Sequence, residues 1–364
     1  MAEPEGNVWR VFCRVRPLLG DELLGNDGRI CHLSFPDKDG KILVLENLSP
    51  HSEDSLTDSK GNNKYEFAFD RVFNPDSTQA QVFEEVRHTV QSALDGYNVC
   101  IFAYGQTGSG KTHTMEGPSE FSHKHAGMIP RAVGQIFDSI QDLVSKEWQY
   151  ELEASFLKIY KERIRDLLGT DSDDVKHQIK KSEKSGSDDQ KGVMVTNLTT
   201  VPVTSKEQVH ELLRKASHTR SVLEVKYDER ASRSQTVFQL RISGVNKNTQ
   251  ETRSGTLTLV DSGGSERVGA SNSGGAQLKE ALSIGRSCSA LRTVFMAIAN
   301  KARFIPYRES KLTHLLQNSL GGDMGKMVML VHVSPKEECF EETLSSLRFA
   351  TRVKKSGIGT TQKE

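Results

Sequence analysis

The chain has 364 residues and carries 48 Lys and Arg against 48 Asp and Glu, so its formal net charge is zero. This balance argues against a globally basic nucleic-acid-binding protein, and no apolar run approaches the roughly 18 residues that a membrane-spanning helix needs. The five cysteines form no CxxC pair, which argues against a zinc site or a disulfide framework and favours a reducing, cytoplasmic setting. We therefore expect neither a nucleic-acid nor a membrane partner.

Apolar residues along the chain alternate between strand-like and helix-like spacing. In chain order, the spacing predicts a strand over 9–16, a helix over 83–94, a buried strand over 99–104, a strand pair over 236–244 and 255–261, a helix over 278–298, a buried strand over 327–333 and a closing helix over 341–353. Interleaved strands and helices are typical of an α/β fold built on a central sheet. The sequence predicts that fold class, as one domain over residues 9–353.

Two polar stretches interrupt these elements. Residues 49–64 and 171–190 are rich in Ser, Asp, Lys and Gly. Segments of this composition do not bury enough apolar surface to form part of a core. We expect both stretches to be surface insertions within the domain rather than boundaries between domains.

The strongest chemical signal directly follows the predicted strand 99–104. It fits the pattern GxxxxGK[ST], and the residues after it can begin a helix, which is the context that a phosphate-binding P-loop requires. Its glycines let backbone N–H groups point inward around phosphate oxygens, Lys111 supplies a positive charge, and the Thr112 hydroxyl can ligate Mg²⁺. A glycine-rich turn that fits by chance is disfavoured, because strand, spacing, Lys and Thr all agree. The predicted nucleotide-binding residues are Gly105, Gln106, Thr107, Gly108, Ser109, Gly110, Lys111 and Thr112.

A second signal lies at the end of the predicted strand 255–261. Asp261 ends that strand, and the pair Gly263-Gly264 follows closely. A carboxylate at a second strand end suits the coordination shell of Mg²⁺, and a backbone amide of the glycine pair is placed to sense the outermost phosphate. A plain turn is the alternative for this run alone, and it is less favoured once the P-loop is considered. We predict a site for ATP and Mg²⁺, with Asp261 in the metal shell.

Together with these two sites, several further motifs resemble a kinesin motor domain. The motifs are GNVWRVFCRVRP at 6–17, YGQTGSGKTHTM at 104–115, IYKERIRDLL at 159–168, DSGGSE at 261–266, YRESKLT at 307–313, LLQNSLGG at 315–322 and LSSLRFA at 344–350. They follow the family's order and spacing over about residues 7–351, and the lead-in and the tail 358–361 are most similar to the C-terminal-motor class. An unrelated P-loop NTPase would need YRESKLT and LLQNSLGG to be accidental.

The resemblance implies a central mixed β-sheet flanked by helices on both faces. It also implies a microtubule-stimulated ATPase that uses ATP and Mg²⁺ and moves towards the minus end. Microtubules are the implied partner, and the cytoskeleton and spindle the implied location. A dimer through a coiled-coil stalk outside this sequence is expected, with residues 1–8 as a neck remnant and 354–364 as a C-terminal tail.

The same resemblance assigns further site residues. Residues 228–235 resemble the family's first switch loop and 261–266 its second. An Arg of the first loop pairs with a Glu of the second when the family's site closes, which would exclude water from the phosphate. The implied catalytic residues are Ser232, which also matches a Mg²⁺ ligand, Arg233, Gly264 and Glu266, and the residues implied to enclose adenine are Arg14, Pro17 and His113.

Both switch loops depart from the family pattern. The first usually reads Asn-x-x-Ser-Ser-Arg-Ser-His, the second Asp-Leu-Ala-Gly-Ser-Glu, and the helix after them Ile-Asn-x-Ser-Leu-Ser-Ala-Leu-Gly. Phosphoryl transfer depends on positioning and electrostatics, so we expect slowed hydrolysis rather than weakened ATP binding. The alternative is a kinesin-like module that binds nucleotide and microtubules but scarcely hydrolyses. The departing residues are Asp228, Ala231, Gln235, Ser262, Gly263, Gly285 and Arg292, with Lys161 replacing an Asn in IYKERIRDLL.

A basic segment lies where the family contacts tubulin. Residues 267–326 carry nine Lys and Arg against three Asp and Glu, a net charge of +6 on a neutral chain. Because the surface of tubulin is acidic, such a segment would steer and hold it, with strong salt dependence. A solvated surface charge is the alternative for any one of these residues. The implied microtubule-binding residues are Lys279, Arg286, Arg303, Arg308 and Lys311.

Overall fold

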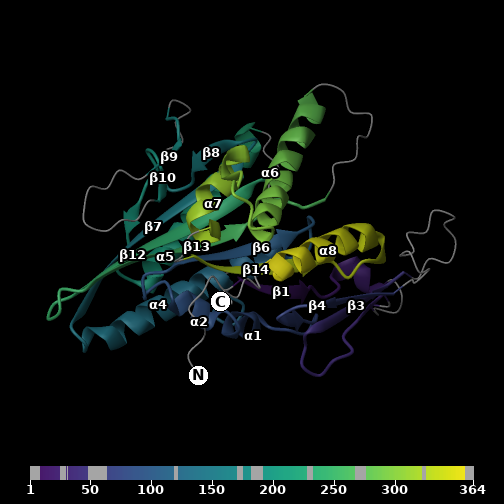
Figure 1. Cartoon of the computed structure of the whole chain (residues 1–364), viewed down its shortest axis with the longest axis horizontal. Helices are drawn as coiled ribbons and strands as arrows, with labels where there is room; N and C mark the ends of the chain where they lie inside the picture. Colours follow the sequence, from purple (N-terminus) through teal and green to yellow (C-terminus); the bar gives the residue numbers. More distant parts are fainter. Residues whose placement is uncertain are drawn as a thin grey trace.

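A computed structural model describes residues 9–24, 30, 32–47, 64–118, 122–169, 175–181, 192–227, 233–266, 276–321 and 325–356 (Figure 1). Its main feature is a nine-stranded sheet in the order β11-β7-β12-β13-β6-β14-β1-β5, with β8 paired to β7. The strands are β1 (Trp9–Val15), β5 (Arg71–Phe73), β6 (Asn98–Gly105), β7 (Trp148–Tyr160), β8 (Arg163–Asp166), β11 (Val201–Pro202), β12 (Gln235–Asn246), β13 (Thr252–Asp261) and β14 (Gly325–Val333).

The sheet is mixed, as the resemblance implied. β13, β6, β14, β1 and β5 run parallel, whereas β12 pairs antiparallel with both β13 and β7. The pairing brings the carboxyl ends of the parallel strands, at Gly105, Asp261 and Val333, to one edge. Open α/β sheets bind their ligands in the crevice outside such strand ends.

Side chains of β6 alternate between two buried faces of the sheet. Phe102 and Tyr104 belong to one apolar cluster, and Ile101 and Ala103 to the other. A strand that is covered on both faces has a continuous apolar sequence. This is why residues 99–104 are recognisable as a buried strand.

Helices cover both faces of the sheet, which confirms the predicted α/β class (Figure 1). The three helices on one face are α6 (Ala276–Ala299), α7 (Lys311–Gly321) and α8 (Phe340–Ser356). The helices on the other face are α1 (Gln79–Glu84), α2 (Arg87–Gln91), α4 (Met128–Val144) and α5 (Lys206–Tyr227), and the short α3 (Lys111–Met115) follows β6. Single 3₁₀ turns are η1 (Gly20–Leu24), η4 (Tyr307–Glu309) and η5 (Glu337–Cys339).

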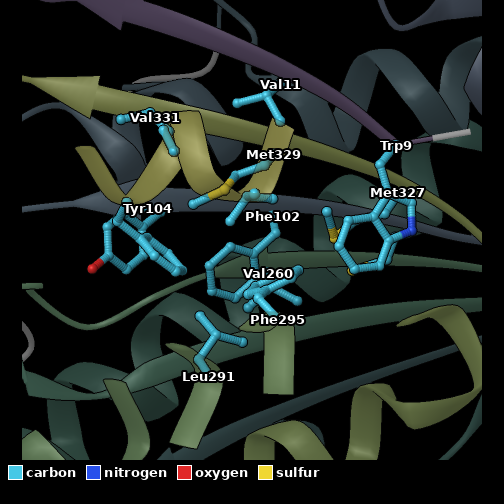
Figure 2. Close-up of a cluster of buried hydrophobic side chains, with 14 of the residues drawn as sticks. Trp9, Val11, Phe102, Tyr104, Val260, Leu291, Phe295, Met327, Met329 and Val331 are labelled. Atoms are coloured by element: carbon cyan, nitrogen blue, oxygen red, sulfur yellow. The ribbon is translucent and has the colours of Figure 1, made fainter. Parts of the chain in front are cut away.

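An aromatic cluster lies between the sheet and α6 (Figure 2). Trp9 of β1 meets Phe295 of α6 edge to face, with ring centroids 5.2 Å apart, and Phe102 and Tyr104 of β6 belong to the same cluster. Full burial of one such side chain contributes about 1.5–3 kcal/mol. The cluster fixes α6 against the strand that leads into the P-loop. The phenol oxygen of Tyr104 points away from the apolar side chains.

The predicted helix over 83–94 is divided in two. α1 ends at Glu84 and α2 begins at Arg87, with Val86 as the N-cap of α2. Phe83, Val86 and Val90 are all buried. Apolar spacing therefore predicts the buried side correctly but does not reveal where the helix breaks.

Part of the second polar stretch is a strand. β9 (Ile179–Lys181) pairs antiparallel with β10 (Val193–Val195), and Ile179 and Val195 join the core at 9% and 7% exposure. Ile179 is therefore part of the core, whereas Lys180 and Lys181 of the same strand are exposed. Residues 171–174 and 182–190 lie outside the described residues, so the surface insertion over 171–190 stays a prediction.

The first polar stretch borders a separate three-stranded sheet of β2 (Leu33–Ser34), β3 (Ile42–Glu46) and β4 (Lys64–Ala68). Lys64 thus begins a strand, and 49–63 lie outside the described residues. At the carboxyl end, α8 continues to Ser356, beyond the predicted limit at 353. The neck remnant at 1–8 lies outside the described residues, so the domain limits stay a prediction. None of the helices in the described ranges is long and apolar enough to cross a membrane.

Candidate active site

The loop between β6 and α3 forms a cradle at the carboxyl edge of the sheet. Gly105, Gly108 and Gly110 have φ angles of 150°, 78° and 95°, which favour glycine. A side chain at Gly105 would also overlap the carbonyl oxygen of His332 in β14. Gly110 is the N-cap of α3, so the loop turns directly into that helix. The glycine spacing in the sequence thus reflects three backbone positions that other residues occupy poorly.

Lys111 lies inside this cradle. Its ammonium group donates a 2.8 Å hydrogen bond to the carbonyl oxygen of Gln106, and only 7% of the residue is exposed. Burial lowers the pKa of the amine, and the carboxylates of Asp261 and Glu266 oppose this shift. An ammonium group has three donors. The buried cation therefore has the capacity to bind an anionic ligand.

Thr112 and Asp261 form an oxygen-rich corner beside Lys111. Thr112 Oγ1 donates a 2.5 Å hydrogen bond to Asp261 Oδ2, while Asp261 Oδ1 is buried with no hydrogen-bond partner among the described residues. Burial raises the pKa of Asp261 to about 6, against the lowering effects of Thr112 and Lys111. Hydroxyl and carboxylate oxygens are ligands that Mg²⁺ prefers. The orphaned oxygen and the donor set fit the predicted metal. Ser232, the third predicted ligand, lies outside the described residues.

The second switch loop is hydrogen-bonded to the P-loop at two places. The backbone N–H of Ser265 donates to the carbonyl oxygen of Gly105 at 3.1 Å. The Glu266 carboxylate accepts from the backbone N–H of Thr107 at 2.9 Å and from Thr107 Oγ1 at 2.5 Å. Residues 261–266 therefore lie directly against the phosphate cradle, as their predicted role requires.

The two glycines of this loop differ in the space around them. A Cβ atom at Gly264 would overlap the Glu266 carboxylate and the Thr107 hydroxyl, whereas one at Gly263 would lie 3.3 Å from the carbonyl carbon of Arg233. A side chain at 264 would therefore have to displace the Glu266 carboxylate and the Thr107 hydroxyl, whereas one at 263 would need a shift of only a few tenths of an ångström. The Arg233–Glu266 latch stays a prediction, because the Glu266 carboxylate engages Thr107 here.

Arg14 lies beneath α3 rather than at the surface. It is 8% exposed and donates to Gln79 Oε1 at 2.6 Å and to Thr114 Oγ1 at 2.8 Å. His332 Nε2 lies 2.7 Å from the same Thr114 hydroxyl. Burial lowers the pKa of Arg14 to about 10 and that of His332 to about 3. Arg14 therefore anchors α3 from within, whereas the other two residues implied to enclose adenine, Pro17 and His113, are exposed.

Two ion pairs that were not predicted support the cradle. Arg16 Nε donates to the carbonyl oxygen of Gly108 at 2.7 Å, and its terminal nitrogens pair with both carboxylate oxygens of Glu22 at 2.6 and 2.8 Å. This pairing lowers the pKa of Glu22 to about 2. Glu116, just after α3, pairs with Arg220 of α5 at 2.6 and 2.9 Å. Arg16 stands in the RVRP motif and could have been found, whereas Glu116 and Arg220 are 104 residues apart and share no local signal.

The basic segment presents part of its charge to solvent. Phe304, at its centre, is 78% exposed. The predicted microtubule-binding residues Arg286, Arg303 and Arg308 are exposed and Lys311 is half-buried, while the side chain of Lys279 lies outside the described part.

Two cations of the basic segment turn inward instead. Arg292 donates to the phenol oxygen of Tyr104 at 3.1 Å, and Lys326 donates to Ser92 Oγ at 2.9 Å. The net charge of the sequence segment therefore overstates the exposed charge by these two residues. Periodicity could not reveal this, because both partners lie far away in the chain.

A carboxylate at the turn between β7 and β8 ties α6 to α7. Glu162 accepts from Ser287 Oγ of α6 and from the backbone N–H of Lys311, the first residue of α7, both at 2.6 Å. Lys161 and Glu162 have left-handed φ angles of 48° and 59°, although neither is glycine. Such backbone costs energy and persists where surrounding contacts hold it. Glu162 thus fixes the spacing of the two helices that border the exposed cations.

Comparison with known proteins agrees with this geometry. The family model described as the kinesin motor domain matches residues 14–356. Carboxy-terminal kinesin 2 of Xenopus laevis is 50% identical over 98% of this chain and 54% of its own length. The motor domain of the Kar3-like kinesin from Ashbya gossypii is 39% identical with a TM-score of 0.76, covering 96% of this chain and 99% of that one.

A further solved structure is that of the C-terminal motor and motor homology domain of Kar3Vik1 fused to a synthetic heterodimeric coiled coil. It is 39% identical with a TM-score of 0.78, covering 95% of this chain and 84% of that one. The present chain spans about half the length of the curated relatives that it matches.

Proposed function

This chain belongs to the kinesin family of motor domains, and from this premise we propose that it is an ATP-dependent microtubule motor head that moves towards the minus end. The observation that carries the proposal is the corner of Lys111, Thr112 and Asp261, where a buried carboxylate oxygen has no hydrogen-bond partner in the part of the chain that the structure describes. The likeness to carboxy-terminal kinesins supports the direction. A microtubule-gliding assay with polarity-marked filaments tests direction, and plus-end-directed gliding would contradict it.

In this proposal Lys111 and the cradle N–H groups bind the outer phosphates of ATP. Thr112 and Asp261, with Ser232, hold Mg²⁺, which neutralises phosphate charge when bound. The backbone N–H of Gly264 meets the γ-phosphate. For Glu266 to pair with Arg233, its carboxylate must first leave Thr107, so closure of the site breaks two hydrogen bonds.

We expect hydrolysis by this chain to be slow, with microtubule-stimulated turnover near or below about 1 s⁻¹, at the low end of ordinary enzymes. The Ser262 hydroxyl is buried without a partner among the described residues, at a position where the family pattern has Leu. Restoring the family residues at Ser262 and Gly263, and at Asp228, Ala231 and Gln235, should raise turnover about tenfold. Steady-state ATPase assays with and without microtubules measure the turnover of the unmodified chain and that of the restored variant.

Strong stimulation of the unmodified chain would contradict slow hydrolysis while leaving the motor assignment intact. The second candidate function is a binding module that holds nucleotide and microtubules but scarcely turns over. The altered second switch favours it. Turnover that stays near zero after restoration, with normal nucleotide affinity, would select this alternative.

We propose microtubules as the partner of the cations on α6, η4 and α7, of which Arg286 and Arg308 are exposed and Lys311 is half-buried. Reversing charge in the double variant Arg308→Glu/Lys311→Glu should raise the microtubule concentration for half-maximal co-sedimentation about tenfold at moderate salt. ADP affinity should stay within about twofold, because neither side chain reaches the cradle. The matched control Lys124→Glu/Lys146→Glu makes the same charge change at exposed residues beside α4. Equal binding by both double variants would reject this face.

We also propose that the chain acts in a dimer, through a stalk outside these 364 residues, on microtubules of the cytoskeleton and spindle. The Kar3Vik1 structure, in which a coiled coil joins two domains, supports the pairing.

A further inference from the structure

Arg292 of α6 stands at a position where the family pattern given above has glycine. Its Nη2 donates a 3.1 Å hydrogen bond to the phenol oxygen of Tyr104, and its Cζ lies 5.5 Å from the ring centroid of Phe349 in α8. Glycine makes neither contact. A single side chain of α6 thus reaches both the strand that leads into the P-loop and α8.

Tyr104 is placed to pass a displacement on to the phosphate cradle. It immediately precedes Gly105 and is 1% exposed. Its ring lies 4.8 Å from that of Phe349, centroid to centroid, and its phenol oxygen points away from the apolar cluster (Figure 2). Because burial holds the ring, the hydroxyl moves with β6.

A second contact lies one helical turn earlier on the same side of α6. Cys288 Sγ is 3.7 Å from the carbonyl oxygen of Gly264 in the second switch loop. The neighbouring Ser265 is bonded to Gly105. α6 therefore touches the second switch loop through Cys288 and the strand that leads into the P-loop through Arg292.

Stability alone does not account for Arg292. Its Nε is buried without an acceptor among the described residues, and it lines a cavity of about 360 Å³ that Arg348 and Arg352 also line, together with Glu341 and Glu342. A buried donor without an acceptor is unfavourable. Methionine would keep the aliphatic packing without this cost. What the guanidinium adds is its bond to Tyr104 and its contact with the Phe349 ring.

We propose that Arg292 is a positioning residue that couples α6 to the phosphate cradle through Tyr104. When nucleotide binding shifts the P-loop strand, this bond transmits the shift to α6. In the other direction, when binding of a partner to the exposed basic segment shifts α6, the bond transmits that shift to the P-loop strand. The inference rests on the proposed function, because it needs a nucleotide in the cradle.

Hydrogen exchange of the full chain, with and without Mg²⁺ and a non-hydrolysable ATP analogue, measures this coupling without microtubules. In the unmodified protein the analogue should slow exchange in the P-loop and in residues 286–299. In Arg292→Met, and in Tyr104→Phe, which loses only the hydroxyl, P-loop protection should remain while protection of 286–299 falls about threefold or more. The double variant should lose no more protection than Arg292→Met alone, because the bond that Tyr104→Phe removes is already absent there.

The matched control is Lys301→Met, which removes an exposed cation two residues beyond the end of the same helix and should leave the protection of 286–299 unchanged. Additive losses in the double variant, unchanged protection in both single variants, or protection confined to the P-loop of the unmodified protein overturns the proposal. Absence of protection anywhere in the unmodified protein instead overturns nucleotide binding itself, which separates failure of the proposed function from failure of this coupling. Tyr104→Phe keeps the buried ring, so it tests the bond even where Arg292→Met perturbs α6.

Discussion

Alanine at position 264 should reduce the microtubule-stimulated ATPase rate about a hundredfold or more. The new Cβ would overlap the Glu266 carboxylate and the Thr107 hydroxyl, and a hydrogen bond already joins these two groups across this glycine. Alanine fits only if the Glu266 carboxylate and the Thr107 hydroxyl move apart, which breaks the hydrogen bond between this loop and the P-loop and disturbs the amide that is proposed to meet the γ-phosphate. Steady-state ATPase assays and single-turnover measurements show whether the loss is in the chemical step.

The neighbouring glycine provides the matched control for this prediction. A Cβ at Gly263 would lie 3.3 Å from the carbonyl carbon of Arg233, a tight contact that a shift of a few tenths of an ångström relieves. Gly263→Ala also restores the family residue, so its turnover should equal or exceed that of the unmodified chain. A Gly264→Ala variant as active as Gly263→Ala would disprove the steric argument.

Replacing Lys111 by methionine should weaken ATP and ADP binding about a hundredfold or more. The substitution removes the buried ammonium group that is hydrogen-bonded to the Gln106 carbonyl oxygen within the loop. The unliganded protein should melt at the same or a higher temperature, since methionine fills the same space without the cost of burying an ammonium group. Titration with a fluorescent ADP analogue and thermal unfolding measure the two quantities.

Lys326→Met serves as the control for Lys111→Met. Lys326 is also hydrogen-bonded, to Ser92, but it lies on β14 opposite Val99, at the far end of β6 from Gly105. Its loss should leave nucleotide affinity unchanged. Equal affinity losses in both variants would mean that the charge of the whole sheet, rather than the cradle, binds the nucleotide.

The phosphate cradle was predictable from sequence because its chemistry is local. Lys111 and Thr112 follow Gly110 directly, and a left-handed N-cap glycine between a strand and a helix needs only neighbouring residues. Asp261 was predictable because the preceding apolar run marks the end of a strand. The order of the strands did not follow from spacing, and it was expected only through the resemblance.

Contacts between distant segments could not be predicted. Glu266 bonds to Thr107 across 159 residues, and Arg292 to Tyr104 across 188. A residue's type gives its donors and charge, but only the packing of helices on the sheet decides which partner it meets. The same reason explains why the burial of Arg14 could not be predicted. The motif identifies the residue, but the hydrogen bonds to Gln79 and Thr114 direct its guanidinium under α3.

Glu162 has a consequence for how motor heads of this kind can be recombined. Its carboxylate sets the spacing of α6 and α7 although it lies 125 residues before Ser287 and 149 before Lys311. The cations proposed to meet tubulin are contiguous in the chain, yet their geometry is inherited from two separate segments. A chimera that exchanges only residues 276–321 between relatives would combine the charges of one protein with the β7–β8 turn of the other, so that turn belongs to the same exchangeable unit.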